Sequence, residues 1–238
     1  MTRLVGQFWV FPDGTRVFAI SGGGGGEETT TIQQALADKN EHFEILGTNG
    51  TSALATFSAS GGITLTTAGA SADQMILLPH LNTGASAWTG TTWATSKELT
   101  WRIMIATAAS IADTTIWAGL KLTNTSVTAT DNEQVFFRYG SGTNSGKWQF
   151  VYSIGGVDVA LDTGITVVLS TYYEFEISLD ALRVPTGLVG VANAPVDKLE
   201  LGTAALASGN LIPYAGVQAD AAAAKAIDVK WVEMSRAF

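Results

Sequence analysis

Two glutamates spaced two residues apart are the side chains in this sequence best arranged for chemistry. Glu174 and Glu176 lie in the alternating segment Tyr173-Glu-Phe-Glu-Ile-Ser-Leu179. Residues two apart in a β-strand point to the same face, and glycoside hydrolysis requires two carboxyl groups flanking the glycosidic bond. The solvent face of an amphipathic strand would carry the same residues, and the Glu-x-Asp-x-x-Glu pattern of sandwich glycosidases is absent. We therefore predict no catalytic residues and no enzyme activity.

Two tryptophans could contribute to a binding site. Trp88 and Trp93 flank a short Thr- and Gly-rich segment. An exposed indole can stack on a sugar ring, anchor a protein interface, or simply pack in a core. Trp88 and Trp93 are therefore candidate glycan-binding residues, with the interface and core alternatives open.

Metal and cofactor chemistry has little support in the sequence. Asp131-Asn132-Glu133 supplies oxygen ligands of the kind that calcium prefers, but it directly precedes a strand-like segment and fits a solvated turn. The two histidines, His42 and His80, lie in no recognisable metal-binding or catalytic motif. Gly22–Gly26 lacks the Lys-Ser/Thr ending of a phosphate-binding loop. We expect no metal site and no cofactor.

The elements that must position these residues have the period of β-strands. From Phe43 onward, apolar residues alternate with polar ones in successive segments separated by Gly-, Asn- and Ser-rich turns. This pattern predicts an all-β antiparallel sandwich of the jelly-roll or concanavalin-like type. Gly155-Gly156 is typical of a two-residue hairpin turn. The apolar faces are expected at Leu99-Trp101-Ile103-Ile105, Ile116-Ala118-Leu120-Leu122, Val135-Phe137-Tyr139, Trp148-Phe150-Tyr152-Ile154, Tyr173-Phe175-Ile177-Leu179 and Ile227-Val229-Trp231.

The first 40 residues differ from the rest and predict a separate N-terminal arm. Gln7–Phe11 and Arg16–Ile20 flank a Pro-Asp-Gly turn and are predicted to form a small hairpin, and the five glycines that follow indicate a flexible linker. Thr29–Asn40 is predicted as a short helix, because Thr31 and Gln34 have capping-box spacing. We therefore divide the chain into an anchoring arm, residues 1–40, and a sandwich domain, residues 41–238.

The hairpin carries more aromatic surface than two strands can bury. An isolated hairpin is marginal in water. Its aromatic side chains are therefore expected to pack against another part of the chain or against a partner. The candidate partner-binding residues are Phe8, Trp9, Phe11 and Phe18.

Composition narrows the classes of function. The 46% hydrophobic and 14% charged residues are those of a globular protein. A net charge of -8 opposes phosphate binding, so no nucleic-acid partner is expected. The sequence shows no run of apolar residues long enough for a membrane span, so no membrane partner is expected. The absence of cysteine fits synthesis in a reducing cytoplasm.

About four fifths of the chain, from Phe43 to the C-terminus, resembles a family of structural proteins in tailed-bacteriophage virions. The motifs are strand and turn patterns and include no catalytic motif. They are Gly62-Ile-Thr-Leu-Thr-Thr, Ile76-Leu-Leu-Pro-His, Trp117-Ala-Gly-Leu-Lys-Leu-Thr-Asn-Thr, Gln134-Val-Phe-Phe-Arg-Tyr, Ser145-Gly-Lys-Trp-Gln, Ser153-Ile-Gly-Gly and Asp162-Thr-Gly.

The resemblance implies a non-enzymatic part of a virion assembled in a bacterial host cytoplasm. We expect a capsid decoration or cement protein that binds the major capsid protein through its N-terminal arm. The alternative is a tail-fibre or head-fibre module that binds host-surface glycan. Sandwich edges are usually covered in assemblies, so a homo-oligomer, for which we predict a trimer, is also expected.

Overall fold

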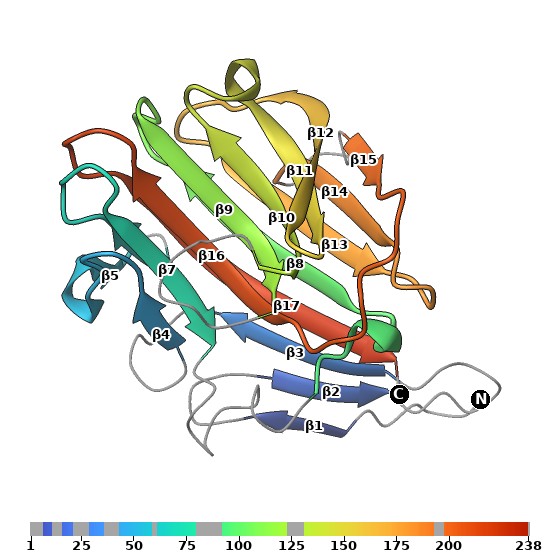
Figure 1. Cartoon of the computed structure of the whole chain (residues 1–238). Helices are drawn as coiled ribbons and strands as arrows, with labels where there is room; N and C mark the ends of the chain where they lie inside the picture. The colour runs from blue at the N-terminus through green and yellow to red at the C-terminus, as the bar shows by residue number, and fades with distance from the viewer. Residues whose placement is uncertain are drawn as a thin grey trace.

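Alternating segments from both halves of the chain form a two-layered antiparallel β-sandwich in a computed structural model (Figure 1). The structure describes residues 7–10, 16–20, 29–35, 43–58, 61–79, 92–122, 131–192 and 198–237. Within β1, β2, β3 and β15 it describes the backbone and, of the side chains, only that of Thr31. No helix in these ranges is long and apolar enough to cross a membrane.

The larger layer has ten strands. Eight form a continuous path: β1 (Gln7–Val10), β2 (Arg16–Ile20), β3 (Thr29–Ala35), β17 (Ala226–Ala237), β8 (Thr100–Thr107), β13 (Tyr172–Leu179), β14 (Pro185–Val191) and β15 (Lys198–Leu201). The other two are β5 (Ala55–Phe57) and β6 (Ile63–Thr66), which pair with each other. Strand β6 also pairs with the first residues of β17, and β3 pairs with the last residues of β17.

The second layer has seven strands and faces the viewer in Figure 1. In order across the sheet they are β12 (Val157–Thr166), β11 (Lys147–Ile154), β10 (Glu133–Gly140), β9 (Thr114–Lys121), β16 (Ile212–Ala219), β7 (Gln74–Pro79) and β4 (Phe43–Leu46). Three short 3-10 turns complete the described elements: η1 (Ser52–Leu54), η2 (Thr95–Lys97) and η3 (Asn144–Gly146).

The core lies between the two sheets and contains most of the predicted alternating residues. Trp101, Phe137, Trp148 and Phe175 are essentially inaccessible, and Trp148 lies edge-on to Phe175 with ring centroids 4.8 Å apart. The hairpin predicted at Gly155-Gly156 is confirmed, since these glycines have φ of 58° and 79° and join β11 to β12. The β-sandwich prediction is therefore correct.

The predicted helix at Thr29–Asn40 is wrong. Residues Thr29–Ala35 form strand β3, which pairs with β17 on one side and β2 on the other (Figure 1). Three consecutive threonines followed by isoleucine favour extended backbone, and the edge of β17 supplies hydrogen-bond partners that an isolated segment lacks. The capping-box spacing was a coincidence of a polar strand.

The predicted hairpin is present in the backbone, because β1 pairs with β2. It continues the ten-stranded sheet through β3, instead of standing apart from it (Figure 1). The Gly22–Gly26 linker and the proposed boundary at residue 40 lie outside the described residues. The division into arm and sandwich therefore stays a prediction.

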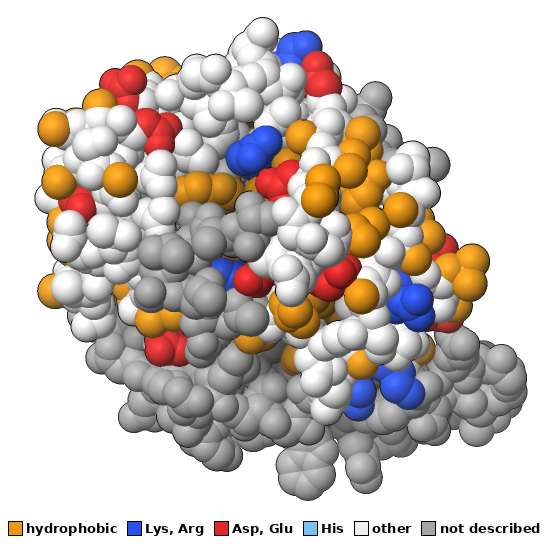
Figure 2. Space-filling model, viewed as in Figure 1, with side chains coloured by type: hydrophobic (Ala, Val, Ile, Leu, Met, Phe, Trp, Pro, Cys, Tyr) orange, Lys and Arg blue, Asp and Glu red, His pale blue; other side chains and the backbone are white. Residues whose placement is uncertain are grey.

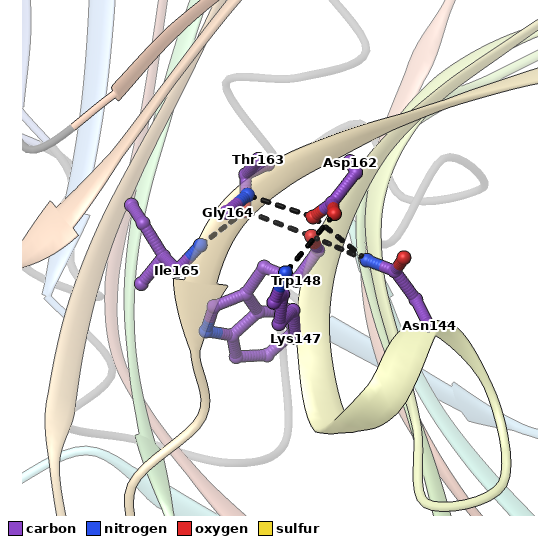
Figure 3. A network of polar contacts seen from close by, with 7 residues as sticks. All are labelled: Asn144, Lys147, Trp148, Asp162, Thr163, Gly164 and Ile165. Atoms are coloured by element: carbon purple, nitrogen blue, oxygen red, sulfur yellow. Dashed lines mark hydrogen bonds and ion pairs between the residues drawn. The ribbon is translucent and has the colours of Figure 1, made fainter.

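Asp162-Thr-Gly164 lies inside β12 and not in a turn between strands. There the register with β11 shifts, and Gly164 adopts a φ of 77°. The Asp162 carboxylate accepts hydrogen bonds from Gly164 N at 2.7 Å and Asn144 Nδ2 at 3.0 Å, and Lys147 Nζ lies 3.2 Å away (Figure 3). These donors lower the Asp162 pKa, and the network fixes a β-bulge.

Candidate functional site

A second β-bulge, in β17, turns a tryptophan out of the core. The register with β8 shifts between Val229 and Trp231, which leaves Lys230 as the extra residue. Val229 is buried before the bulge and Val232 and Met234 after it. Trp231 is half-buried and faces outward. The prediction that Trp231 shares the core face of Ile227 and Val229 is therefore wrong, because one inserted residue reverses the alternation.

The outward side of the ten-stranded sheet forms an open groove beside this indole. Cross-strand pairing places Trp231 opposite Met104 and Met104 opposite Glu174, while the next row holds Glu233, Arg102, Glu176 and Leu188. We call the hollow between these rows the Trp231 groove. Its outward-facing lining includes Arg102, Glu174, Glu176, Leu188 and Trp231.

An ion pair fixes one wall of the Trp231 groove. Arg102 Nε lies 2.9 Å from Glu176 Oε2, and Arg102 Nη1 lies 4.0 Å from Glu233 Oε1. The second oxygen of Glu176 accepts a long hydrogen bond of 3.5 Å from Ser178 Oγ. With side chains 49% and 27% exposed, Arg102 and Glu176 remain accessible to a ligand.

Glu174 is the unused group of the groove. It is half-buried, and within the described part of the chain its carboxylate has no hydrogen-bond or ion-pair partner. Its neighbours across the strands are Gly190 and Met104, neither of which offers a side-chain donor. The groove therefore presents a carboxylate that has no partner among the described residues, in the same cross-strand row as Trp231.

The two glutamates do share a strand face, as predicted, but their arrangement does not match a hydrolytic pair. Both project from one strand, β13, and so lie on the same wall of the groove. A glycosidase pair must flank the scissile bond. Glu176 is also held by Arg102. This geometry fits ligand binding better than proton transfer to a bond between the carboxyls.

The outward side of the seven-stranded sheet carries a different cluster. Trp117, Phe136 and Tyr214 alternate with core residues along β9, β10 and β16, but they are only 8%, 3% and 4% exposed. Phe136 and Tyr214 are in ring contact, with centroids 6.4 Å apart. With so little exposed surface, none of these three rings offers a face on which a sugar could stack. We call this group the closed aromatic cluster.

Charged and polar groups around the closed aromatic cluster are matched to one another. Arg138 donates from Nε and Nη2 to Gln149 Oε1 at 3.1 and 2.9 Å. Ser153 donates to Asp158. Figure 2 shows acidic and basic side chains next to one another on this side of the molecule.

Lys121 and Tyr214 are the buried ionisable groups of this cluster. Lys121 is 1% exposed, and its Nζ lies 5.5 Å from the centre of the Tyr214 ring. Burial lowers the Lys121 pKa, and burial also raises the pKa of Tyr214 well above its usual value. Both shifts favour the neutral forms and agree with a region closed to water.

The predicted binding residues are only partly covered by the structure. Trp93 is 4% exposed and packs in the core, so its prediction as a sugar-stacking residue is wrong and the core alternative is the correct one. Trp88, Phe11, His42 and His80 lie outside the described residues. The backbones of Phe8, Trp9 and Phe18 lie in β1 and β2, and their roles as partner-binding residues stay predictions.

Asp131-Asn132-Glu133 is a junction between a loop and a strand, as the turn interpretation predicted. Asp131 accepts a hydrogen bond from Leu122 N at 3.1 Å. The Glu133 carboxylate accepts from Gly155 N at 3.2 Å and from Ala207 N at 2.7 Å. Backbone amides therefore occupy the oxygens that the calcium interpretation had assigned to a metal.

Comparison with known proteins supports the fold. No protein-family model and no curated protein sequence matches the chain. A Shewanella oneidensis MR-1 protein of unknown function aligns over 88% of this chain and 87% of its own, with 9% identity and a TM-score of 0.63. The Emp47p carbohydrate recognition domain aligns over 86% and 94%, with 10% identity and a TM-score of 0.57.

Winged bean acidic lectin, in complex with methyl-α-D-galactose, aligns over 88% of this chain and 99% of its own, with 11% identity and a TM-score of 0.53. A Trypanosoma rangeli sialidase is also similar, at 11% identity and a TM-score of 0.52, but only 30% of its length is matched. At these identities the likeness establishes a lectin-like jelly-roll β-sandwich and nothing about ligands. Nothing in these likenesses shows a virion protein.

Proposed function

We propose that this protein is a non-enzymatic carbohydrate-binding module that holds a saccharide in the Trp231 groove. The observation that carries the proposal is the outward turn of Trp231 at the bulge in β17, in a groove that also holds the Arg102–Glu176 ion pair and Glu174, which has no partner within the described ranges. Bulges commonly re-aim a side chain at a functional site.

The groove contains both kinds of surface that a sugar ring requires. A pyranose has an apolar C–H face that packs on an indole, and Leu188 adds a further apolar side chain to the lining. Its hydroxyls need fixed donors and acceptors, which Arg102, Glu174 and Glu176 supply. A few polar groups within an apolar lining are typical of small-ligand sites.

The similar structures support the same function at the level of the fold. Several are lectins or carbohydrate recognition domains, including a winged bean lectin bound to methyl-α-D-galactose. This favours the glycan-binding alternative over capsid decoration. It does not identify the residues used, for which the proposal depends on the groove itself.

The proposed biological setting is the tail fibre or head fibre of a bacteriophage, with host-surface glycan as the ligand. This part depends only on the sequence resemblance to virion proteins. Capsid decoration, binding to the major capsid protein and a homotrimeric state remain predictions that neither the fold nor the similar structures support.

An array of immobilised neutral, acidic and free-amino glycans tests the proposal. Wild-type protein should bind a subset of the array, and Trp231→Ala should lower the affinity about tenfold or more, as expected from losing a stacking contact worth about 1.5 kcal/mol. Phe57→Ala is the matched control, because Phe57 is a 44% exposed aromatic outside the groove.

Binding that is equal in the Trp231→Ala and Phe57→Ala variants would refute the groove as the site. A wild-type protein that bound no glycan on the array would refute carbohydrate binding altogether. Far-ultraviolet circular dichroism on each variant checks that both remain folded.

A further inference from the structure

We infer that the Trp231 groove selects saccharides that carry a free, protonated amino group. This inference depends on the proposed function and adds the chemical class of the ligand. Its basis is the charge of the groove together with the contacts already made by each charged side chain.

Among the described residues that line the groove or ion-pair with its lining, the carboxylates outnumber the cations. Glu174, Glu176 and the adjacent Glu233 contribute three negative charges, and Arg102 contributes one positive charge, so this group carries a formal charge of 1 - 3 = -2. A sialylated, sulfated or uronic saccharide would bring a further negative charge into this region. Like charges this close oppose binding, so acidic glycans are disfavoured.

The existing ion pairs leave one carboxylate for the ligand. Arg102 lies within ion-pair distance of both Glu176 and Glu233. Glu174 has no such partner among the described residues. A half-buried carboxylate gains most from a charged donor, because bonds between an ammonium and a carboxylate are about twice as strong as neutral ones.

Trp231 reinforces the same preference. An ammonium group over an indole face is attracted by the quadrupole of the ring, so Glu174 and Trp231 both stabilise a positive charge placed between them. The sugar ring that carries the amine would use the remaining indole surface and Leu188. A neutral N-acetyl group in the same position would keep the ring contacts and lose both charge interactions.

Two tetrasaccharides of glucosamine provide the test: one with free amino groups and one fully N-acetylated. At about pH 6, below the ordinary pKa of an aliphatic amine, wild-type protein should bind the free-amino form about tenfold more tightly by titration calorimetry. That factor corresponds to about 1.4 kcal/mol. Glu174→Gln should reduce the preference to about twofold or less, since glutamine keeps the size and loses the charge.

The matched control is Glu98→Gln. Glu98 is exposed and does not line the groove, so its substitution changes the net charge equally and should leave the preference intact. Raising the salt concentration should weaken the preference in wild-type protein, because partly exposed charges are screened.

The outcomes separate the two proposals. Equal binding of both tetrasaccharides, with Trp231→Ala abolishing each, would overturn the selectivity and leave carbohydrate binding supported. Tetralysine that bound as tightly as the free-amino tetrasaccharide, without dependence on Trp231, would overturn sugar recognition by the groove. Loss of the preference in Glu98→Gln would also overturn the assignment to Glu174.

Discussion

The outward faces of the two sheets are built from the same alternation but differ in what they leave available. The closed aromatic cluster on the seven-stranded sheet has three aromatics at most 8% exposed, and its polar side chains are bonded to each other. The Trp231 groove has one half-buried indole and one carboxylate without a described partner. The number of aromatic residues therefore does not show which face binds a ligand. Solvent-accessible side chains that have no described partner are the better indicator.

The largest expected effect is on the closed face. Trp117→Ala should lower the free energy of unfolding by about 3–5 kcal/mol, because it removes a large buried side chain and leaves a cavity. Urea denaturation measures the loss. Trp231→Ala should cost clearly less, since its indole is only half-buried. Equal losses in the two variants would contradict the distinction between a closed and an open face.

The strands beneath the closed face also tolerate little change. A Cβ added to Gly119 would lie 2.3 Å from the Val135 carbonyl oxygen and 2.5 Å from Phe136 Cα. Gly119→Ala should therefore force β9 and β10 apart, at a cost of about 1–3 kcal/mol by urea denaturation. Gly142→Ala is the control, because nothing lies within 4 Å of its added Cβ. A neutral Gly119→Ala would show that the two strands can separate easily.

A pH-dependent effect should also distinguish the closed face. Because the Lys121 pKa is lowered in the folded protein, the unfolded chain binds a proton that the folded chain does not. Stability should therefore rise as pH increases from the folded pKa toward the unfolded value near 10.5. Lys121→Met should lack this rise when urea midpoints are compared from about pH 8 to about pH 9, below the titration of unfolded tyrosine near pH 10. If the urea midpoints of the wild-type and Lys121→Met proteins changed in parallel with pH, the lowered Lys121 pKa would be contradicted.

The smallest expected change in stability is in the groove. Arg102→Gln removes a 49% exposed ion-pair partner, and exposed pairs contribute about 0–1 kcal/mol. The same substitution makes the groove more negative, so the preference for the free-amino tetrasaccharide should increase. Thermal unfolding and calorimetry on one preparation measure both. A large loss of stability would show that this ion pair supports the sheet as much as it prepares the site.

Sequence periodicity was sufficient for the layers of the sandwich and most of its core. Trp101 and Trp148 each have a polar residue on either side in the sequence, and burial of one face fixes the register. The pairing of Glu174 and Glu176 on one face follows from the same rule. The alternation of core residues and the shared face of the two glutamates depend on residues close together in the chain, so the sequence alone is enough to predict them.

Long-range pairing decided what periodicity could not. Thr29–Ala35 becomes a strand because β17 lies alongside it, and Trp231 leaves the core because Lys230 is inserted opposite β8. The sequence did contain a signal for the outward position of Trp231. Val229 and Val232 are three residues apart, whereas residues on one face of a regular strand are two apart. Trp231 shows the division clearly: the sequence by itself determined its residue type and its place in a strand, but the tertiary structure decided its face. That choice depends on the register between strands distant in the chain, which local propensity does not set.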